Sequence, residues 1–168
     1  MQRSMIDRMK GAALLDVATY EEVEHDPQAT MQAAGVVALV AVASAIGSWQ
    51  LGPISVAWAA VSALLSWGLW AAVTYIVGDK LFGGTATWGE LLRTLGFAQA
   101  PGVLGILVII PFLGWMVAIV MFFWMLATGI VAIRQALDFG TGKAVLTAVI
   151  GLVCVVALRM LMALLGIA

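Results

Sequence analysis

The sequence predicts an all-α integral membrane protein, in which a five-span helical bundle follows two short amphipathic helices. Composition is the first observation: 64 % of the residues are hydrophobic and 10 % are charged, whereas a soluble domain carries about 25 % charged residues. The second is a series of five apolar runs that can cross a bilayer. The third is that all but one of the charges, eight Lys or Arg and nine Asp or Glu, lie on one side of these runs.

Residues 1–28 are expected to form an amphipathic segment in the cytoplasm or at the membrane interface. Met5, Ile6 and Met9 recur at helical spacing among charged neighbours, which is typical of an interfacial helix. Thr19 and Glu22 then form a T-x-x-E pattern, which predicts the capping box of a second short helix.

The second short helix is acidic, with Glu21, Glu22, Glu24 and Asp26. This cluster does not suit anionic lipid headgroups, so it indicates either a docking face for a basic protein partner or a helix face in water. His25 is the only histidine. It could titrate near neutral pH or help to bind a metal with Glu21 and Glu22, but a histidine among exposed carboxylates is usually a plain surface residue.

Five runs are expected to span the membrane, and residues 29–168 form the transmembrane domain. Asp26 and Pro27 predict the start of the first span, because Asp caps free amides and Pro suits the first helical position. Pro53 opens the second span and Gly78 closes it. At about 1.5 Å per residue each run can cover roughly 30 Å of hydrocarbon. The predicted spans are residues 29–49, 53–77, 88–110, 114–133 and 144–165.

The third run is ambiguous, because its purely apolar part, from Pro101 to Ile110, is short. Thr87 and Glu90 form another T-x-x-E pattern, which predicts a helix start at Trp88 and a full span if Pro101 only kinks the helix. The alternative is a re-entrant hairpin that enters and leaves on one side. Five full spans place seven of the eight Lys and Arg inside and the hairpin places six, so the positive-inside rule favours five spans.

The same charge distribution predicts a cytoplasmic N-terminus and a C-terminus outside. The two connections expected outside, Gln50–Gly52 and Pro111–Gly114, carry no charge. Arg159, in the fifth span, is the one exception to the pattern. A long Arg near a helix end can snorkel to the lipid phosphates, and the alternative is a contact with a partner subunit or a polar cavity.

Polar residues in the third run form a second candidate region. Glu90 and Arg93 are three residues apart on one helix and are a candidate ion pair. Pro101 frees a backbone carbonyl one turn earlier, which Gln99 or a water could satisfy. Gln99 and Arg159 are therefore candidate intramembrane polar residues of a permeation path, although a proline kink more often only shapes packing.

Motifs of catalysis are missing from the sequence. It has no G-x-S-x-G, no H-E-x-x-H and no phosphate-binding glycine-rich loop, and its single Cys154 lies in an apolar run. The formal net charge of −1 argues against a nucleic-acid partner. We therefore expect a non-catalytic protein without cofactor or metal. Small residues at four-residue spacing, such as Ser44/Ser48 and Ala59/Ala63, indicate helices that approach closely.

The segment Gly96-Phe97-Ala98-Gln99-Ala100-Pro101 resembles the G-Y-x-x-x-P motif of the Yip family of Rab-interacting membrane proteins, with Phe97 in place of Tyr. Together with residues 14–30, 92–101, 111–114 and 133–144 it is similar to the bacterial branch of that family. The resemblance implies a five-span helical bundle with a cytosolic N-terminus and no catalytic activity. The D-L-Y-G-P motif of eukaryotic members is absent, so Rab binding is not expected.

Three functions remain open at this point. The first is a multi-pass scaffold or adaptor in the bacterial cytoplasmic membrane, which contacts membrane lipids and associates with a second copy or with other membrane-protein subunits. The second is an accessory subunit of a respiratory or photosynthetic complex. The third is a small transporter, channel or lipid-moving protein with a path near Pro101.

Overall fold

The computed structural model describes residues 3–48 and 52–164, without the side chains of residues 158, 159, 162 and 163. Within these ranges the chain is helical, and no strand is present. The elements are α1 (Met5–Ala13), α2 (Val17–His25), α3 (Ala29–Gly47), α4 (Pro53–Tyr75), a π-helical turn η1 (Ile76–Leu81), α5 (Trp88–Ala98), a 3-10 helix η2 (Ala100–Ile109), α6 (Gly114–Ala136) and α7 (Thr141–Leu164).

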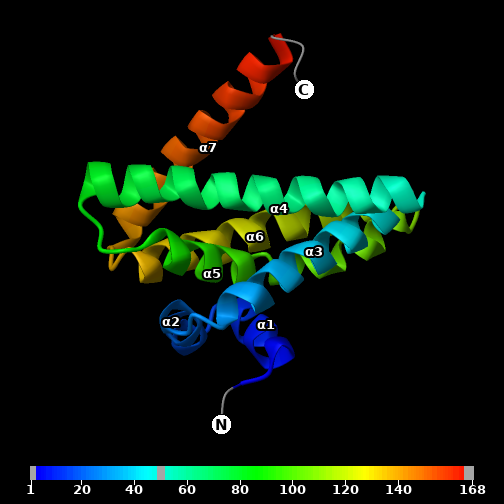
Figure 1. The fold of residues 1–168 in the computed structure, drawn as a ribbon. Helices are drawn as coiled ribbons and strands as arrows, with labels where there is room; N and C mark the ends of the chain where they lie inside the picture. The colour runs from blue at the N-terminus through cyan, green and yellow to red at the C-terminus, as the bar shows by residue number, and fades with distance from the viewer. Residues whose placement is uncertain (1–2, 49–51, 165–168) are drawn as a thin grey trace.

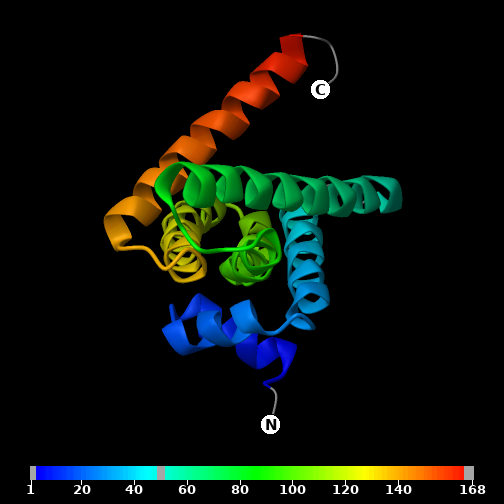
Figure 2. The same cartoon turned by 60° about the vertical axis from the view of Figure 1, so that its left-hand side comes forward.

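The helices are stacked in layers (Figures 1 and 2). The long α4 lies on one side, α3, α5 with η2, and α6 form the middle layer, and α1 with α2 lie on the opposite side. Helix α7 starts beside the ends of α4 and α6 and then leaves the body of the molecule. The prediction of an all-helical chain with two short helices before the long ones is confirmed.

Among the described residues, four long apolar segments can cross a membrane by length and composition: α3, α4 with η1, α5 with η2, and α6. In α7 the described side chains form a further apolar stretch, Thr141–Ala157. Burial divides these segments into central and peripheral helices. Within the most apolar 18 residues of each, 56 % are buried in α5–η2 and 44 % in α3, but only 17 % in α6 and 11 % in α4. The centre of the bundle is therefore α3 packed on the third segment.

The third segment runs parallel to α3 from Gly96 to Gly105. A Cβ atom added to Gly96 would lie 2.6 Å from the Cβ of Ala33, one added to Gly102 would lie 2.6 Å from Val40, and one added to Gly105 would approach Ser44. Residues 33–44 of α3 and residues 96–105 of the third segment therefore run side by side in the same direction. Over these residues the segment does not turn back, as a re-entrant hairpin would.

The third segment changes from an α-helix to a 3-10 helix, and this change makes it longer than an α-helix of the same number of residues. The α-helix ends at Ala98, and the ten residues of η2 then follow as a 3-10 helix with Pro101 in its first turn. Such runs are seldom longer than three or four residues. Because a 3-10 helix rises by about 2.0 Å per residue against 1.5 Å in an α-helix, η2 covers roughly 20 Å instead of 15 Å.

Two predicted helix boundaries are wrong. The second short helix begins at Val17, with Asp16 as its N-cap, because the Asp16 carboxylate accepts the Ala18 N–H at 3.2 Å; Thr19 is not its cap. Gly78 does not close the second span either, because the helix continues through η1 to Leu81. A Cβ atom added to Gly78 would lie 2.3 Å from the side chain of Leu137. The lack of a side chain at Gly78 therefore leaves room for Leu137, the residue that follows α6.

Other boundaries agree with the sequence or shift slightly. The capping box of Thr87 and Glu90 is present, and α5 begins at Trp88 as predicted. The first span begins at Ala29 as predicted, but its N-cap position is Gln28 and Pro27 precedes the helix, although Asp26 does accept the Gln28 N–H at 3.0 Å. The fourth span ends at Ala136 rather than at residue 133, and the last helix begins at Thr141 rather than at residue 144.

Candidate functional site

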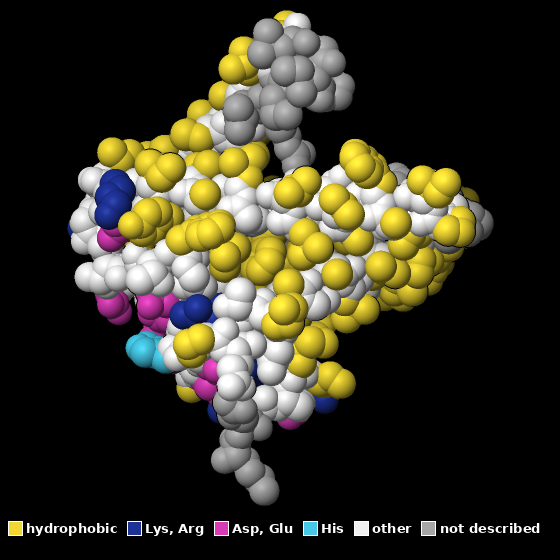
Figure 3. All heavy atoms as spheres, viewed as in Figure 1, with side chains coloured by type: hydrophobic (Ala, Val, Ile, Leu, Met, Phe, Trp, Pro, Cys, Tyr) yellow, Lys and Arg dark blue, Asp and Glu magenta, His cyan; other side chains and the backbone are white. Residues whose placement is uncertain are grey.

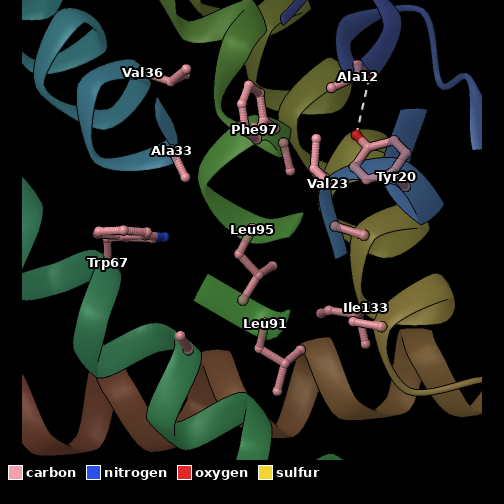
Figure 4. Packing of buried hydrophobic residues seen from close by; sticks show 14 of the residues in the cluster. Ala12, Tyr20, Val23, Ala33, Val36, Trp67, Leu91, Leu95, Phe97 and Ile133 are labelled. Atoms are coloured by element: carbon pink, nitrogen blue, oxygen red, sulfur yellow. Dashed lines mark hydrogen bonds between the residues drawn. The ribbon is translucent and has the colours of Figure 1, made fainter. Parts of the chain in front are cut away.

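The first two helices form a unit that is packed on the bundle, and we refer to α1 and α2 together as the N-terminal cap. Its apolar side is part of the main core: Ala12, Tyr20 and Val23 are fully buried in one cluster with Phe97 and Ile133 (Figure 4). The cap contacts α5 and α6, so it is docked on helices of the bundle.

Two aromatic side chains bind the C-terminal carbonyls of α1. The Tyr20 hydroxyl lies 3.0 Å from the Ala12 carbonyl oxygen (Figure 4) and 3.3 Å from that of Thr128. The Trp124 indole N–H donates to the Ala13 carbonyl at 2.7 Å. The last carbonyls of a helix have no partner within the helix. These bonds supply partners and attach α1 to α2 and to α6.

Arg8 is the central polar residue of the cap, and it is 1 % exposed. Its guanidinium donates to Glu22 at 3.0 Å, to Gln32 at 3.0 Å and to Asp26 at 2.7 Å. The hydrogen bond from Arg8 lowers the pKa of Asp26 below its ordinary value of 3.8. One side chain of α1 thereby holds the end of α2 and the start of α3, since a buried guanidinium is stable only when its charge and donors are matched.

Arg93 binds the same cap from the bundle side. Its Nε donates to the carbonyl oxygens of Val23 and Glu24, both at 3.0 Å, and a terminal nitrogen donates to Glu24 as well. A cation at the C-terminal end of α2 is favourable because the carbonyls there are unpaired and the helix dipole is negative. The Glu90 carboxylate instead accepts the Thr87 N–H at 2.7 Å, so both members of the candidate pair Glu90–Arg93 have other partners.

The four carboxylates of the candidate docking face have separate roles in the structure. Glu22 and Asp26 bind Arg8. Glu21 accepts a hydrogen bond from the Gln135 side chain of α6 at 2.5 Å. Glu24 is only 8 % exposed. Most of this acidic charge is therefore engaged in holding the cap together and fixing it to α6, and little of it forms an open acidic surface.

Glu24 is the exception, because its buried carboxylate has no such partner. Its Oε2 atom is buried without a hydrogen bond. Burial, followed by repulsion from Glu21, raises the pKa of Glu24 to about 7. A hydrogen bond to the Glu21 carbonyl and the nearby carboxylate of Glu24 raise the pKa of His25. Ligand atoms of Glu21, Glu24 and His25 all lie within 4.8 Å of one another.

Gln99 and Pro101 lie where the third segment changes to a 3-10 helix. Pro101 has no N–H and the Gly102 N–H donates to Gln99, so the Ala98 carbonyl loses its usual helical donors. The Thr128 hydroxyl of α6 donates to that carbonyl at 2.7 Å. The freed carbonyl is therefore at Ala98 and its partner is Thr128, not Gln99 as we expected.

Gln99 borders two cavities on opposite sides of the third segment. One, of about 290 Å³, lies between α3 and α4 and includes the small residues Ser44, Ser48, Ala59 and Ala63. The other, of about 260 Å³, lies towards α6 and α7 and is almost entirely apolar. The small residues at four-residue spacing thus leave space between α3 and α4 beside a polar amide.

The Gly96–Phe97–Pro101 motif has a packing role in this structure. Gly96 allows α5 to approach Ala33 of α3, Phe97 is fully buried in the core, and Pro101 opens the 3-10 helix. The remaining candidate, Arg159, has its side chain outside the described part of the structure.

The residues that attach the cap were not identified from the sequence. From the sequence, Arg8 is only one of the charges on the predicted cytoplasmic side, and Arg93 is a candidate partner of Glu90 rather than of the cap. No pattern in the sequence singles out Tyr20, Thr128 or Gln135. Nothing in the spacing of these residues shows that they meet, because their contacts join segments up to 114 residues apart.

Comparison with known proteins relates this architecture to one family. The sequence model of the Yip1 domain matches residues 17–164, which extend from α2 to the end of α7. No curated protein and no solved structure matches the chain.

Proposed function

This chain belongs to the Yip1 domain family, and from that premise we propose that it is a non-catalytic scaffold or adaptor of the membrane. Proteins of this family are generally non-catalytic membrane trafficking proteins, and this member is a multi-pass helical membrane protein with four candidate spans. The observation that carries the proposal is the docked cap. A polar unit that Arg8 and Arg93 hold in one position on the bundle can present a fixed surface to a partner.

For the membrane topology we propose five spans, with the cap in the bacterial cytoplasm and the C-terminus outside. The one-sided distribution of charge supports this orientation. The parallel course of α3 and the third segment supports a third span in the same direction as the first. Helix α7 is the fifth span in this arrangement. Single cysteines in a Cys154→Ser background test it: Phe112→Cys, at a position 93 % exposed between η2 and α6, should react with an impermeant maleimide on intact cells.

The matched position is Lys143, in the first turn of α7. Lys143→Cys should react only after the cells are permeabilised. Reaction of Lys143→Cys on intact cells, or protection of Phe112→Cys, would contradict the proposed orientation.

The proposed association is with a second copy of the chain, through α4 and α7. Exposed apolar side chains line both helices, among them Trp58 and Leu65 on α4 and Leu152 and Val153 on α7, and α7 diverges from the bundle (Figures 1 and 2). Crosslinking in native membranes, followed by mass spectrometry, should recover homo-oligomers or one stable membrane partner. A strictly monomeric protein without a recovered partner would contradict the scaffold function.

A second candidate function is the movement of a lipid or a small molecule, and the cavity between α3 and α4 favours it. Gln99 and two serine hydroxyls border this cavity in an otherwise apolar region. Phospholipid scrambling by the purified protein in liposomes tests this function, with Gln99→Leu as the variant. Scrambling that Gln99→Leu abolishes would support a lipid path over a scaffold, and equal rates with and without protein would exclude lipid movement.

A further inference from the structure

We propose that Glu21, Glu24 and His25 form a binding site for a single transition-metal ion of the Zn²⁺ type at the C-terminal end of α2. The three residues are one turn apart at positions i, i+3 and i+4, so they share one face of the helix. One ligand atom from each lies within 4.8 Å of the others. In Figure 3 the histidine, in cyan, lies at the surface beside acidic side chains in magenta.

The spacing suits a small ion after a modest movement. Bonds of about 2.0–2.2 Å in a tetrahedral zinc site hold the ligand atoms roughly 3.3–3.5 Å apart. The three groups would therefore approach by about 1.5 Å or less, which rotation of Glu and His side chains can provide. Three protein ligands leave the fourth position for a water molecule.

Glu24 is the observation that distinguishes this site from an ordinary acidic surface. Its side chain is more than nine-tenths buried, and its Oε2 atom has no hydrogen-bond partner. A buried polar atom without a partner is costly. Arg93 does not relieve that cost, because its guanidinium binds the Glu24 backbone carbonyl. A cation bound between Glu21, Glu24 and His25 would supply the missing partner.

The supporting residues around the site are arranged as they are around known metal ligands. The Nδ1 atom of His25 lies 2.9 Å from the Glu21 carbonyl oxygen; because a carbonyl can only accept, Nδ1 carries the proton and Nε2 keeps a lone pair for a metal. Gln135 donates to the Glu21 carboxylate. Hydrogen bonds to a ligating carboxylate and from the second nitrogen of a ligating histidine orient metal ligands.

The local field is negative, which favours a cation over a neutral ligand. Glu90 and Asp138 act on the Glu24 carboxylate from α5 and from the turn after α6, in addition to Glu21 on its own helix. The imidazole distinguishes between cations, because Zn²⁺, Ni²⁺ and Cu²⁺ accept nitrogen ligands while Mg²⁺ and Ca²⁺ prefer oxygen. A bound ion would join the end of α2 to α6 through Glu21 and Gln135.

Titration of Zn²⁺ into the purified full-length protein tests the site. The protein would be prepared without a histidine tag, stripped with EDTA and kept in detergent micelles, with calorimetry as the readout. We expect one ion per chain with a Kd of about 10 µM or tighter. Glu24→Gln and His25→Gln, which preserve size, should each weaken binding at least tenfold, and Ca²⁺ should bind at least tenfold more weakly than Zn²⁺.

Asp7→Asn is the matched control, because it removes an exposed carboxylate of α1 away from the site. It should leave the Zn²⁺ affinity within twofold of the unmodified protein. The proposal is overturned if Zn²⁺ shows no saturable binding, if Glu24→Gln or His25→Gln binds as tightly as the unmodified protein, or if Ca²⁺ binds as well as Zn²⁺. Circular dichroism of each variant shows whether a weaker affinity reflects loss of ligands or loss of the helix.

Discussion

Two buried arginines hold the N-terminal cap on the bundle. Arg8 joins α1 to α2 and α3, and Arg93 binds the last carbonyls of α2 from α5. The sequence shows Arg8 only as a member of a charged face and Arg93 as a candidate partner of Glu90, and a surface position is the usual one for Arg. Burial of Arg8 is possible because three oxygen-bearing side chains from two other helices surround it, an arrangement that exists only after the chain has folded.

Replacement of Arg8 by methionine is expected to release the N-terminal cap. Glu22 and Asp26 would lose their buried partner, and breaking a buried ion pair from one side costs about 3–5 kcal/mol. Limited proteolysis should then cleave the segment between α1 and α2, near residues 14–16, at least tenfold faster. Lys10→Met is the control, because it removes an exposed charge of the same helix. If Lys10→Met were cleaved as fast as Arg8→Met, the loss of a positive charge alone would explain the effect.

Glu24 makes the stability of the metal-free protein depend on pH. Its pKa is raised from 4.5 to about 7 by burial and by Glu21, so the folded protein keeps a proton that the unfolded chain loses. That stabilisation is complete below about pH 4.5 and is lost as the pH rises through 7. The part that depends on Glu24 is of the order of 3 kcal/mol over this interval.

The measurement is the midpoint of thermal unfolding in EDTA at pH 5 and at pH 8. The unmodified protein should lose more stability between these values than Glu24→Gln, whose amide stays neutral. His25 is present in both proteins, and part of the rise in its pKa comes from the Glu24 carboxylate that the variant lacks. An equal loss in the two proteins would show that Glu24 ionises at an ordinary pH.

At the scale of elements, the third segment shows what the sequence can and cannot predict. The start at Trp88 follows from the local capping box of Thr87 and Glu90, so it was predicted correctly. The positive-inside rule favours a full third span over a re-entrant hairpin by a single positive charge. The structure adds a second observation, which is the parallel course of this segment beside α3. The long 3-10 helix was not predicted, because it depends on contacts with α3 and α6, including the bond from Thr128 to Ala98.

Thr128→Val is expected to destabilise the bundle by about 1–2 kcal/mol. The substitution keeps the shape but removes the hydroxyl that donates to the Ala98 carbonyl, which has no other donor from its own helix. Thr147→Val is the matched control, because the Thr147 hydroxyl is buried without a partner. Thermal unfolding in detergent should give a lower midpoint for Thr128→Val and an equal or higher one for Thr147→Val. The reverse order would refute this role of Thr128.

In the molecule as a whole, the charged residues that lie on one side in the sequence also make the polar contacts between the helices. The buried arginines lie on the cap and on α5, and the acidic residues that act on Glu24 lie on the cap, α5 and the turn after α6. In Figure 3 the acidic side chains in view lie over one end of the bundle and over the cap. The sequence predicts the class, the number of apolar helices and this polarity, because they depend on composition and periodicity. It could not predict that the cap folds onto α5 and α6, since that depends on matching between distant helices.

The most direct test of the account is whether the cap lies on α6 in the native membrane. Glu21→Cys and Gln135→Cys, in the Cys154→Ser background, would be treated with a short bifunctional thiol reagent and examined by mass spectrometry. Because the side chains of Glu21 and Gln135 are in contact, we expect an efficient crosslink within one chain, and a loss of that crosslink in Arg8→Met. No crosslink, or one equally efficient between Glu21→Cys and Ile54→Cys at the far end of α4, would contradict it.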